Sequence, residues 1–120
     1  MAKPLIAVTM GDPAGIGPEI VARTIDDKEI FNIARCIVIG DRKIMEKAIQ
    51  IVGADLKIHV TDNPAEGDYS EGVLNLIDLD NINMDQFEYG KVSAMCGQAA
   101  YDYIAKSIEI TMSGQADAVA

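Results

Sequence analysis

A chain of 120 residues has the length of one domain or of part of one, and its apolar share of 49% is ordinary for a globular protein. Its 10 basic and 19 acidic residues give a formal net charge of −9, which repels nucleic acid phosphates and anionic membrane surfaces and so excludes both as expected partners. The first apolar stretch is too short for a signal peptide and no run approaches the ~20 apolar residues of a membrane span, so we expect a cytoplasmic protein.

The first predicted element is a strand over 4–10, which leads directly into a glycine-rich run over 11–20. Three glycines in that run favour a sharp turn and allow another group to approach the main chain. Pro18 and Glu19 are typical of a first helical turn, because proline has the backbone angle of that position and a carboxylate favours the positive helix end. The pattern therefore predicts a strand, a tight loop and a helix that begins at Gly17 or Pro18.

Main-chain N–H groups at the start of this helix favour an anion, such as a phosphate, a carboxylate or a dinucleotide pyrophosphate, although Glu19 would compete with it. The glycine spacing differs from the dinucleotide fingerprint G-x-G-x-x-G, and the residues after Gly17 exclude a P-loop. A strand-to-helix turn without a ligand fits the same pattern, so both alternatives stay open. The candidate cofactor- or substrate-binding residues are Gly11, Asp12, Pro13, Ala14, Gly15 and Gly17.

The next part of the chain predicts a strand followed by a helix. Residues 37–39 form an apolar run that ends at Gly40, as expected of a central parallel strand. Asp41 predicts the N-cap of a helix whose apolar residues recur at helical spacing over 44–52. Gly53 is the expected end of that helix.

Alternating apolar and polar residues over 56–60 predict a strand near a sheet edge, with one exposed face. His59, the only histidine of the sequence, lies on the exposed face, so we expect a surface or hydrogen-bonded structural histidine. A metal site needs several converging ligands, and the sequence has no Cys or His cluster. Residues 62–72 predict an exposed loop without the order of a calcium site, and 73–79 predict a further strand.

The last long predicted element is a helix over about 93–113, in which Ser93 serves as the cap and Gly114 marks the end. Residues 116–120 then predict the beginning of another strand. The apolar stripe expected to pack against the sheet comprises Val92, Cys96, Ala99, Ala100, Tyr103, Ile104 and Ile108.

Together these elements predict an α/β fold, with about five mostly parallel strands and helices on both faces of the sheet. Ligands of such a sheet bind beyond the carboxyl ends of its strands, where the Gly11 loop and the turn at Gly40 and Asp41 would share one rim. Cys36 and Cys96 are expected to be buried free thiols. Because the chain stops as a strand begins, we expect residues 1–120 to be a single α/β unit, the N-terminal portion of a larger two-domain protein.

Two separated stretches resemble one known family. The first is GDPAGIGPEI at 11–20, after the strand-like IAVTM, and the second begins with GKVSA at 90–94. The second stretch continues with Gly97, Ala99, Ala100, Tyr101, Tyr103, Ile104, Gly114 and the string ADAV at 116–119. Both are similar to the 4-hydroxythreonine-4-phosphate dehydrogenases, a family that includes the D-erythronate and D-threonate 4-phosphate dehydrogenases. Residues 62–88 are too generic to add to this resemblance.

The resemblance implies a fold like the N-terminal part of the isocitrate and isopropylmalate dehydrogenases, a homodimer, and NAD or NADP with a divalent metal as cofactors. The implied reaction oxidises and decarboxylates a 4-phosphorylated hydroxy acid, such as 4-phosphohydroxy-L-threonine in pyridoxal phosphate biosynthesis, 4-phosphoerythronate or 4-phosphothreonate. Family members place the metal-ligating histidines and most substrate-binding residues after the part that matches. We therefore assign no metal ligand or catalytic residue to this chain, and the alternative remains a noncatalytic α/β folding fragment or anion-binding module.

Overall fold

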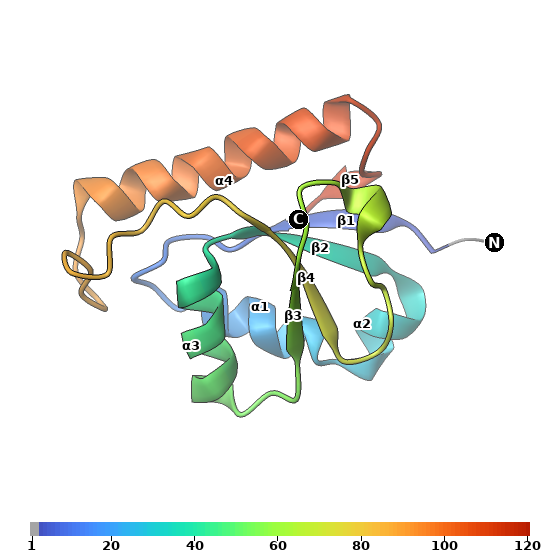
Figure 1. Cartoon of the computed structure of the whole chain (residues 1–120), viewed down its shortest axis with the longest axis horizontal. Helices are drawn as coiled ribbons and strands as arrows, with labels where there is room; N and C mark the ends of the chain where they lie inside the picture. Colours follow the sequence, from blue (N-terminus) through green and yellow to red (C-terminus); the bar gives the residue numbers. More distant parts are fainter. Residues whose placement is uncertain (1–2) are drawn as a thin grey trace.

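The computed structural model describes residues 3–120 and contains one five-stranded sheet in which every pair of neighbouring strands is parallel (Figure 1). The strands are β1 (Leu5–Thr9), β2 (Arg35–Gly40), β3 (Lys57–Val60), β4 (Val73–Asp78) and β5 (Ala118–Val119), in the spatial order β3-β4-β2-β1-β5. The helices are α1 (Gly17–Ile25), α2 (Lys28–Ile33), α3 (Arg42–Val52) and α4 (Ala94–Met112), with a short 3₁₀ helix η1 (Pro64–Glu66).

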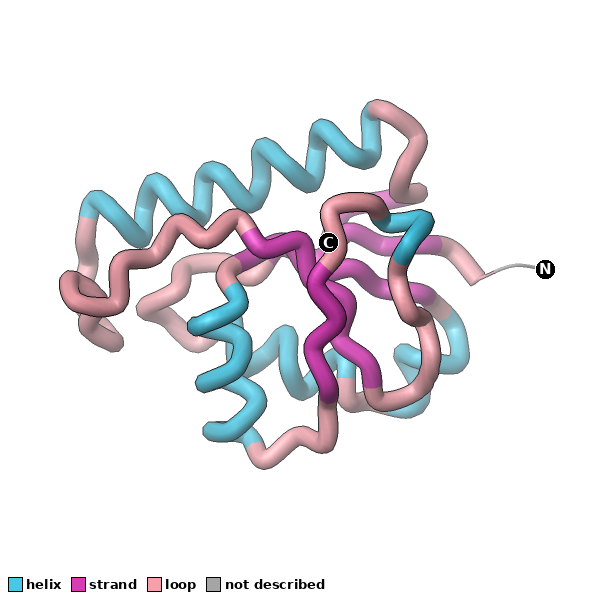
Figure 2. The backbone as a smooth tube through the Cα atoms, viewed as in Figure 1, coloured by secondary structure: helices cyan, strands magenta, loops and turns pink. Residues whose placement is uncertain are grey.

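Helices cover both faces of this sheet. Helices α1 and α3 pack against each other on one face, whereas α4 crosses the other face over β1, β2 and β5 (Figures 1 and 2). The predicted α/β fold with a parallel sheet between helices is therefore confirmed. No helix among residues 3–120 combines the length and the apolar character that a bilayer crossing requires.

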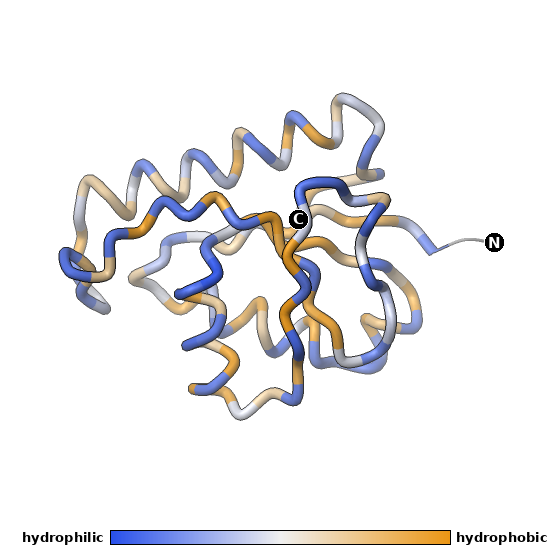
Figure 3. The backbone as a smooth tube through the Cα atoms, viewed as in Figure 1, coloured by the Kyte–Doolittle hydropathy of each residue, from blue (hydrophilic) through white to orange (hydrophobic). Residues whose placement is uncertain are grey.

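Strand β2 lies at the centre of the sheet and carries the middle of the core (Figure 3). Its residues Ile37, Val38 and Ile39 are fully buried, because successive side chains point to opposite faces and both faces are covered. Burying each such side chain stabilises the fold by about 1.5–3 kcal/mol. The continuous apolar run that predicted a central strand is thus explained by its position.

The predicted helix ends are also confirmed. The Asp41 carboxylate accepts a hydrogen bond from the Ile44 N–H at 3.2 Å at the start of α3, and the Ser93 hydroxyl accepts one from the Cys96 N–H at 3.1 Å at the start of α4. Gly53 follows α3 with a φ of +69°, a left-handed conformation that glycine adopts without strain.

Strand β3 lies at the sheet edge, as predicted, and this position exposes more of it than expected. Val60 is 40% exposed although the alternation placed it on the buried face, because an edge strand has a neighbour on one side only. His59 is partly buried, and its Nε2 atom lies 3.2 Å from the main-chain oxygen of Glu66. The expectation of a hydrogen-bonded structural histidine is confirmed.

Two expectations about packing need correction. Only part of the predicted apolar stripe of α4 faces the sheet, since Ile104 and Ile108 are 50% and 51% exposed. Apolar residues surround more of this helix than one sheet face can cover. The residues of α4 that are buried are Cys96, Ala99, Tyr103, Ser107 and Ile110. Both cysteines are free thiols, as expected, but Cys36 is only partly buried.

Candidate functional site

The loop that joins β1 to α1 leaves the sheet at the carboxyl end of β1. Gly11 has a φ of +79°, which a residue with a side chain rarely adopts. A Cβ atom on Gly17 would lie 2.6 Å from the Met10 carbonyl oxygen, so the main chain approaches itself too closely for any other residue. Gly15 has neither a positive φ nor a neighbour closer than 3.5 Å to such an atom. The path of the main chain therefore explains why two of the three positions, 11 and 17, are glycine.

Asp12 closes this loop on itself. Its Oδ1 atom accepts a hydrogen bond from the Ala14 N–H at 2.9 Å, and its carbonyl oxygen accepts one from the Gly15 N–H at 3.0 Å. Pro13 and Ala14 are buried beneath the turn, while Asp12 and Gly15 are exposed. The six predicted residues thus form one compact loop, of which Asp12 and Gly15 face solvent.

Helix α1 begins at Gly17, as predicted, and its N-cap residue is Ile16. No side chain caps the first turn by a hydrogen bond, and Ile16 is 69% exposed. Main-chain N–H groups in this position favour an anion, and Glu19 adds its own negative charge to the same turn. The arrangement can receive an anion, with Glu19 as the competing group.

A segment far along the chain lies against this loop. The Gly90 N–H donates a hydrogen bond to the Ala14 carbonyl oxygen at 2.9 Å. Beside it, the Phe87 and Tyr89 rings meet edge to face with centroids 4.7 Å apart, and burial together with the Glu19 charge raises the pKa of Tyr89. The sequence patterns did not predict this contact. The one residue in this segment that indicates a sharp turn from the sequence is Gly90, which has a φ of +74° in the structure.

The turn at Gly40 and Asp41 borders the same rim. A Cβ atom on Gly40 would lie 2.8 Å from the side chain of Met10, which is fully buried between the ends of β1 and β2. The Asp41 carboxylate is also fully buried, and its Oδ2 atom accepts a hydrogen bond from the Ile82 N–H at 3.3 Å. The predicted shared rim is confirmed, with the chain after β4 as a further member.

Asp41, Asp78 and Asp80 form an acidic cluster at this rim, with carboxylate oxygens within 4.8 Å of one another. Lys43 binds Asp80 and lies 3.3 Å from Asp41, and these two carboxylates raise the pKa of its ammonium group. Asp78 accepts hydrogen bonds from the N–H groups of Arg42 and Asp80. Because Lys43 or main-chain N–H groups already bind at least one oxygen of each carboxylate, we assign the cluster a structural role, in which it joins the start of α3 to the chain after β4.

Tyr103 links α4 to the same edge of the sheet. Its side chain is fully buried, and its hydroxyl donates a hydrogen bond to Asn81 Oδ1 at 2.8 Å. Burial, followed by the charge of Asp41, raises the pKa of this phenol. A neutral, hydrogen-bonded tyrosine therefore fixes the distance between the helix and the rim.

Sequence comparisons agree with this architecture. A sequence model described as "Pyridoxal phosphate biosynthetic protein PdxA" matches residues 32–120. A protein of Fusobacterium nucleatum described as "Putative D-threonate 4-phosphate dehydrogenase" is 52% identical over 115 residues, which make up 96% of this chain and 35% of that protein. A protein of Symbiobacterium thermophilum with the same description is 44% identical over 117 residues, or 98% of this chain and 35% of that protein. The chain thus spans about 35% of the length of these relatives.

Solved structures show the same likeness in three dimensions. A 4-hydroxythreonine-4-phosphate dehydrogenase from Burkholderia phymatum superposes with a TM-score of 0.94 at 39% identity, over 99% of this chain and 36% of that one. The enzyme of that description from Klebsiella pneumoniae gives a TM-score of 0.89 at 29% identity, over 98% of this chain and 35% of that one. The chain therefore belongs to the family of the pyridoxal phosphate biosynthetic protein PdxA.

Proposed function

We propose that this chain is part of an NAD- or NADP-dependent dehydrogenase that acts on a small 4-phosphorylated hydroxy acid. The observation that carries the proposal is the 52% identity, over 96% of the chain, to the Fusobacterium nucleatum protein described as "Putative D-threonate 4-phosphate dehydrogenase". Identity to the solved 4-hydroxythreonine-4-phosphate dehydrogenase is lower, at 39%. We therefore place D-threonate 4-phosphate first among the candidate substrates, before 4-phosphohydroxy-L-threonine and 4-phosphoerythronate.

When bound, a nicotinamide cofactor would supply the hydride acceptor for oxidation of the hydroxyl group on the substrate carbon β to the carboxylate. The product has a keto group in the β position to its carboxylate, and such an acid loses carbon dioxide. The family resemblance adds a divalent metal to the proposal. The Asp41, Asp78 and Asp80 carboxylates do not fit that role, because Lys43 and main-chain N–H groups already bind them. We therefore place the metal ligands outside residues 1–120 and derive no step from the metal.

The role proposed for the Gly11 loop is to line one side of the site. Its exposed residues and the uncapped first turn of α1 offer main-chain N–H groups to a phosphate or carboxylate of the substrate or cofactor. The loop stands at the carboxyl edge of a parallel sheet, the usual place for ligands in such folds. A homodimer, which the resemblance implies, and a cytoplasmic location, which the sequence led us to expect, complete the proposal.

The test is to express the gene with all of its downstream coding sequence and to incubate the product with NAD or NADP, a divalent metal and each of the three candidate substrates. We expect reduced cofactor to accumulate, measured by its absorbance, with D-threonate 4-phosphate turned over most efficiently. Failure with every substrate and both cofactors would overturn the proposal. The alternative, a noncatalytic folding fragment or anion-binding module, predicts that residues 1–120 alone are inactive, and turnover by that chain would reject it.

A further inference from the structure

A cavity lies beside Arg35 at the amino ends of β1 and β2, the edge of the sheet opposite the Gly11 loop. Its volume is about 430 Å³, which is within the range of small-molecule sites, and it is partly open to solvent. Three parts of the chain line it, namely the amino ends of the strands, η1 with the nearby Tyr69, and the turn after α4. The cavity therefore has room for a small ligand.

The charged residues among those that line this cavity are Arg35 and Asp117, which have opposite signs. Arg35 pairs with Leu5 in the register of β1 and β2, and the register of β1 and β5 places Asp117 next to Leu5 on the other side. The three residues thus stand in one row across three adjacent strands. Because neighbouring strands are about 4.8 Å apart, the main chains that carry the two charges are about 10 Å apart.

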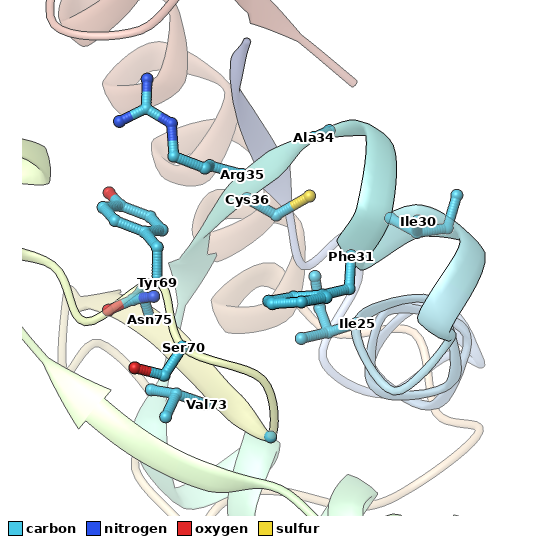
Figure 4. A pocket seen from close by; sticks show the side chains of 11 residues that line it. Ile25, Ile30, Phe31, Ala34, Arg35, Cys36, Tyr69, Ser70, Val73 and Asn75 are labelled. Carbon is cyan, nitrogen blue, oxygen red and sulfur yellow. The ribbon is translucent and has the colours of Figure 1, made fainter. Parts of the chain in front are cut away.

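Arg35 is held in place by contacts that leave most of its donors free. Its Nε donates a hydrogen bond to the Lys3 carbonyl oxygen at 3.0 Å, and its guanidinium carbon lies 5.5 Å from the centroid of the Tyr69 ring. Figure 4 shows the Arg35 and Cys36 side chains on opposite sides of β2, with Arg35 beside Tyr69. Within the described residues 3–120, no protein oxygen accepts a hydrogen bond from its two terminal nitrogens. These nitrogens can therefore bind a carboxylate from solution.

Asp117 is fixed to the neighbouring strand β1. Its Oδ2 atom accepts a hydrogen bond from the Leu5 N–H at 2.8 Å, and its own N–H donates one to the Leu5 carbonyl oxygen at 2.8 Å. In the part of the chain that the structure describes, neither Asp117 nor Arg35 takes part in an ion pair. Two opposite charges are thus held apart in one cavity.

This pair of charges favours one class of ligand. A simple anion attracted by Arg35 is repelled by Asp117, and a simple cation is repelled by Arg35. A zwitterion interacts favourably with both. The apolar side chains of Leu5, Pro64 and Ala65 also line the cavity, so the ligand gains from an apolar part as well.

We propose that the cavity beside Arg35 binds a small apolar α-amino acid as its zwitterion. The ligand carboxylate pairs with the Arg35 guanidinium, its ammonium group pairs with the Asp117 carboxylate, and its side chain packs against Leu5 and Pro64. Because the cavity lies at the amino edge of the sheet, this ligand is distinct from the substrate proposed for the Gly11 loop.

The first experiment titrates the ¹⁵N-labelled chain with L-valine at constant pH and chloride concentration and follows amide chemical shifts by NMR. We expect saturable shifts at Ala65, Gln115 and Asp117, with a dissociation constant on the order of 1 mM for so small a ligand. Two analogues each lack one charged group of valine: 3-methylbutanoate lacks the ammonium group, and 2-methylpropan-1-amine lacks the carboxylate. Each should bind about tenfold more weakly than L-valine, because it forms only one of the two charge-assisted contacts.

Three outcomes of this titration would overturn the proposal. They are shifts that do not saturate, shifts that cluster at the Gly11 loop, and an analogue that binds as tightly as L-valine.

The second experiment removes each charge of the cavity in turn. Arg35→Gln should abolish the preference for L-valine over 2-methylpropan-1-amine, because the carboxylate no longer has a charged partner. Asp117→Asn should abolish the preference for L-valine over 3-methylbutanoate, and its side-chain oxygen can still accept the hydrogen bond from the Leu5 N–H. Circular dichroism reports whether each variant folds, and if one unfolds, the other decides.

Matched controls come from the exposed ion pair between Arg42 and Glu46 on α3, which begins at the carboxyl edge of the sheet. Arg42→Gln and Glu46→Gln make the same changes in net charge as the two cavity variants, and both should leave all three affinities unchanged. If a cavity variant and its control had equal effects, binding would depend on the total charge of the chain, and the assignment of Arg35 and Asp117 would be wrong.

Discussion

At the scale of single residues, Gly17 shows how close packing of the main chain limits the sequence of the candidate site. In Gly17→Ala the new Cβ would meet the Met10 carbonyl oxygen at 2.6 Å, a main-chain atom at the end of β1 that has little freedom to move. We expect a loss of about 1–3 kcal/mol in the free energy of unfolding, measured by urea denaturation.

Gly97 in α4 is the matched control. A Cβ atom there meets nothing within 4 Å, so Gly97→Ala should stabilise the protein by about 0.5–1 kcal/mol through the better helix propensity of alanine. If Gly17→Ala lost no stability, the Gly11 loop would have relaxed around the new atom, and the close approach of Gly17 to Met10 would not be required.

Tyr103 predicts a pH dependence of stability. Its pKa is raised in the folded protein, so the folded state holds the phenol proton more tightly than the unfolded state does. The stability linked to this group is therefore complete below the ordinary tyrosine pKa of 10.0 and is lost progressively as the pH rises above it, because the unfolded chain then ionises first. Tyr103→Phe should remove this part of the alkaline loss.

The same variant should cost about 1 kcal/mol at neutral pH, because it removes the hydrogen bond to Asn81. Urea midpoints between pH 8 and about 11 measure both effects, given the ordinary tyrosine pKa. Tyr101→Phe is the control, since Tyr101 is 66% exposed and should leave the alkaline slope unchanged. An alkaline slope that persists in Tyr103→Phe would assign the loss to other groups.

At the scale of elements, α4 presents apolar residues on two sides, and only one side packs. Ile110 is 1% exposed, whereas Ile108 on the same helix is 51% exposed. Ile110→Ala should therefore lower the free energy of unfolding by about 2–5 kcal/mol, because it leaves a cavity against the sheet. Ile108→Ala should change it by no more than about 0.5 kcal/mol.

Urea denaturation of both isoleucine variants measures the two free energies of unfolding, and the comparison uses the same substitution at two positions of one helix. A large effect of Ile108→Ala would indicate that the outer side of α4 is covered in solution. Sedimentation equilibrium of the chain at the same concentrations then shows whether a second copy provides that cover.

The elements that could be predicted from the sequence are those with a local signal. Strand β2 has a continuous apolar run, and α3 has helical spacing between an Asp cap and a left-handed glycine. Helix α2 has six residues and none of them fully buried, so no apolar period identifies it. Which side of α4 packs depends on the sheet and is not encoded in the apolar pattern of the helix alone.

In the candidate site, too, local features could be predicted from the sequence and long-range contacts could not. The turn at Gly11 and the start of α1 at Gly17 are local, and both could be predicted from glycine and proline positions. The bond between Gly90 and Ala14 joins residues far apart in the chain, and the pairing of Lys43 with Asp80 depends on how β2 and β4 are placed in the sheet. Such contacts arise only once the parallel order is formed, and no single stretch of sequence carries them.

At the scale of the whole molecule, the parallel order of the strands gives the sheet two different edges. All strands point the same way, so the Gly11 loop and the acidic cluster meet at the carboxyl edge, while the cavity beside Arg35 lies at the amino edge. The net charge of −9 also affects the stability of the fold, because like charges repel one another in the folded chain.

With a net charge of −9, the folded chain repels itself more strongly than the expanded unfolded chain does. The exposed ion pair between Arg42 and Glu46 contributes little, and salt screens it as well. Raising the salt concentration from about 0.01 M to 0.15 M shortens the screening length from about 30 Å to 8 Å, so relief of the repulsion should dominate. We expect the free energy of unfolding to increase by about 1 kcal/mol, measured by urea midpoints in sodium chloride and again in choline chloride to separate screening from binding of a particular cation. A decrease in both salts would mean that attractive pairs outweigh the excess of acidic residues, and an increase in sodium chloride alone would indicate a cation bound to the folded chain.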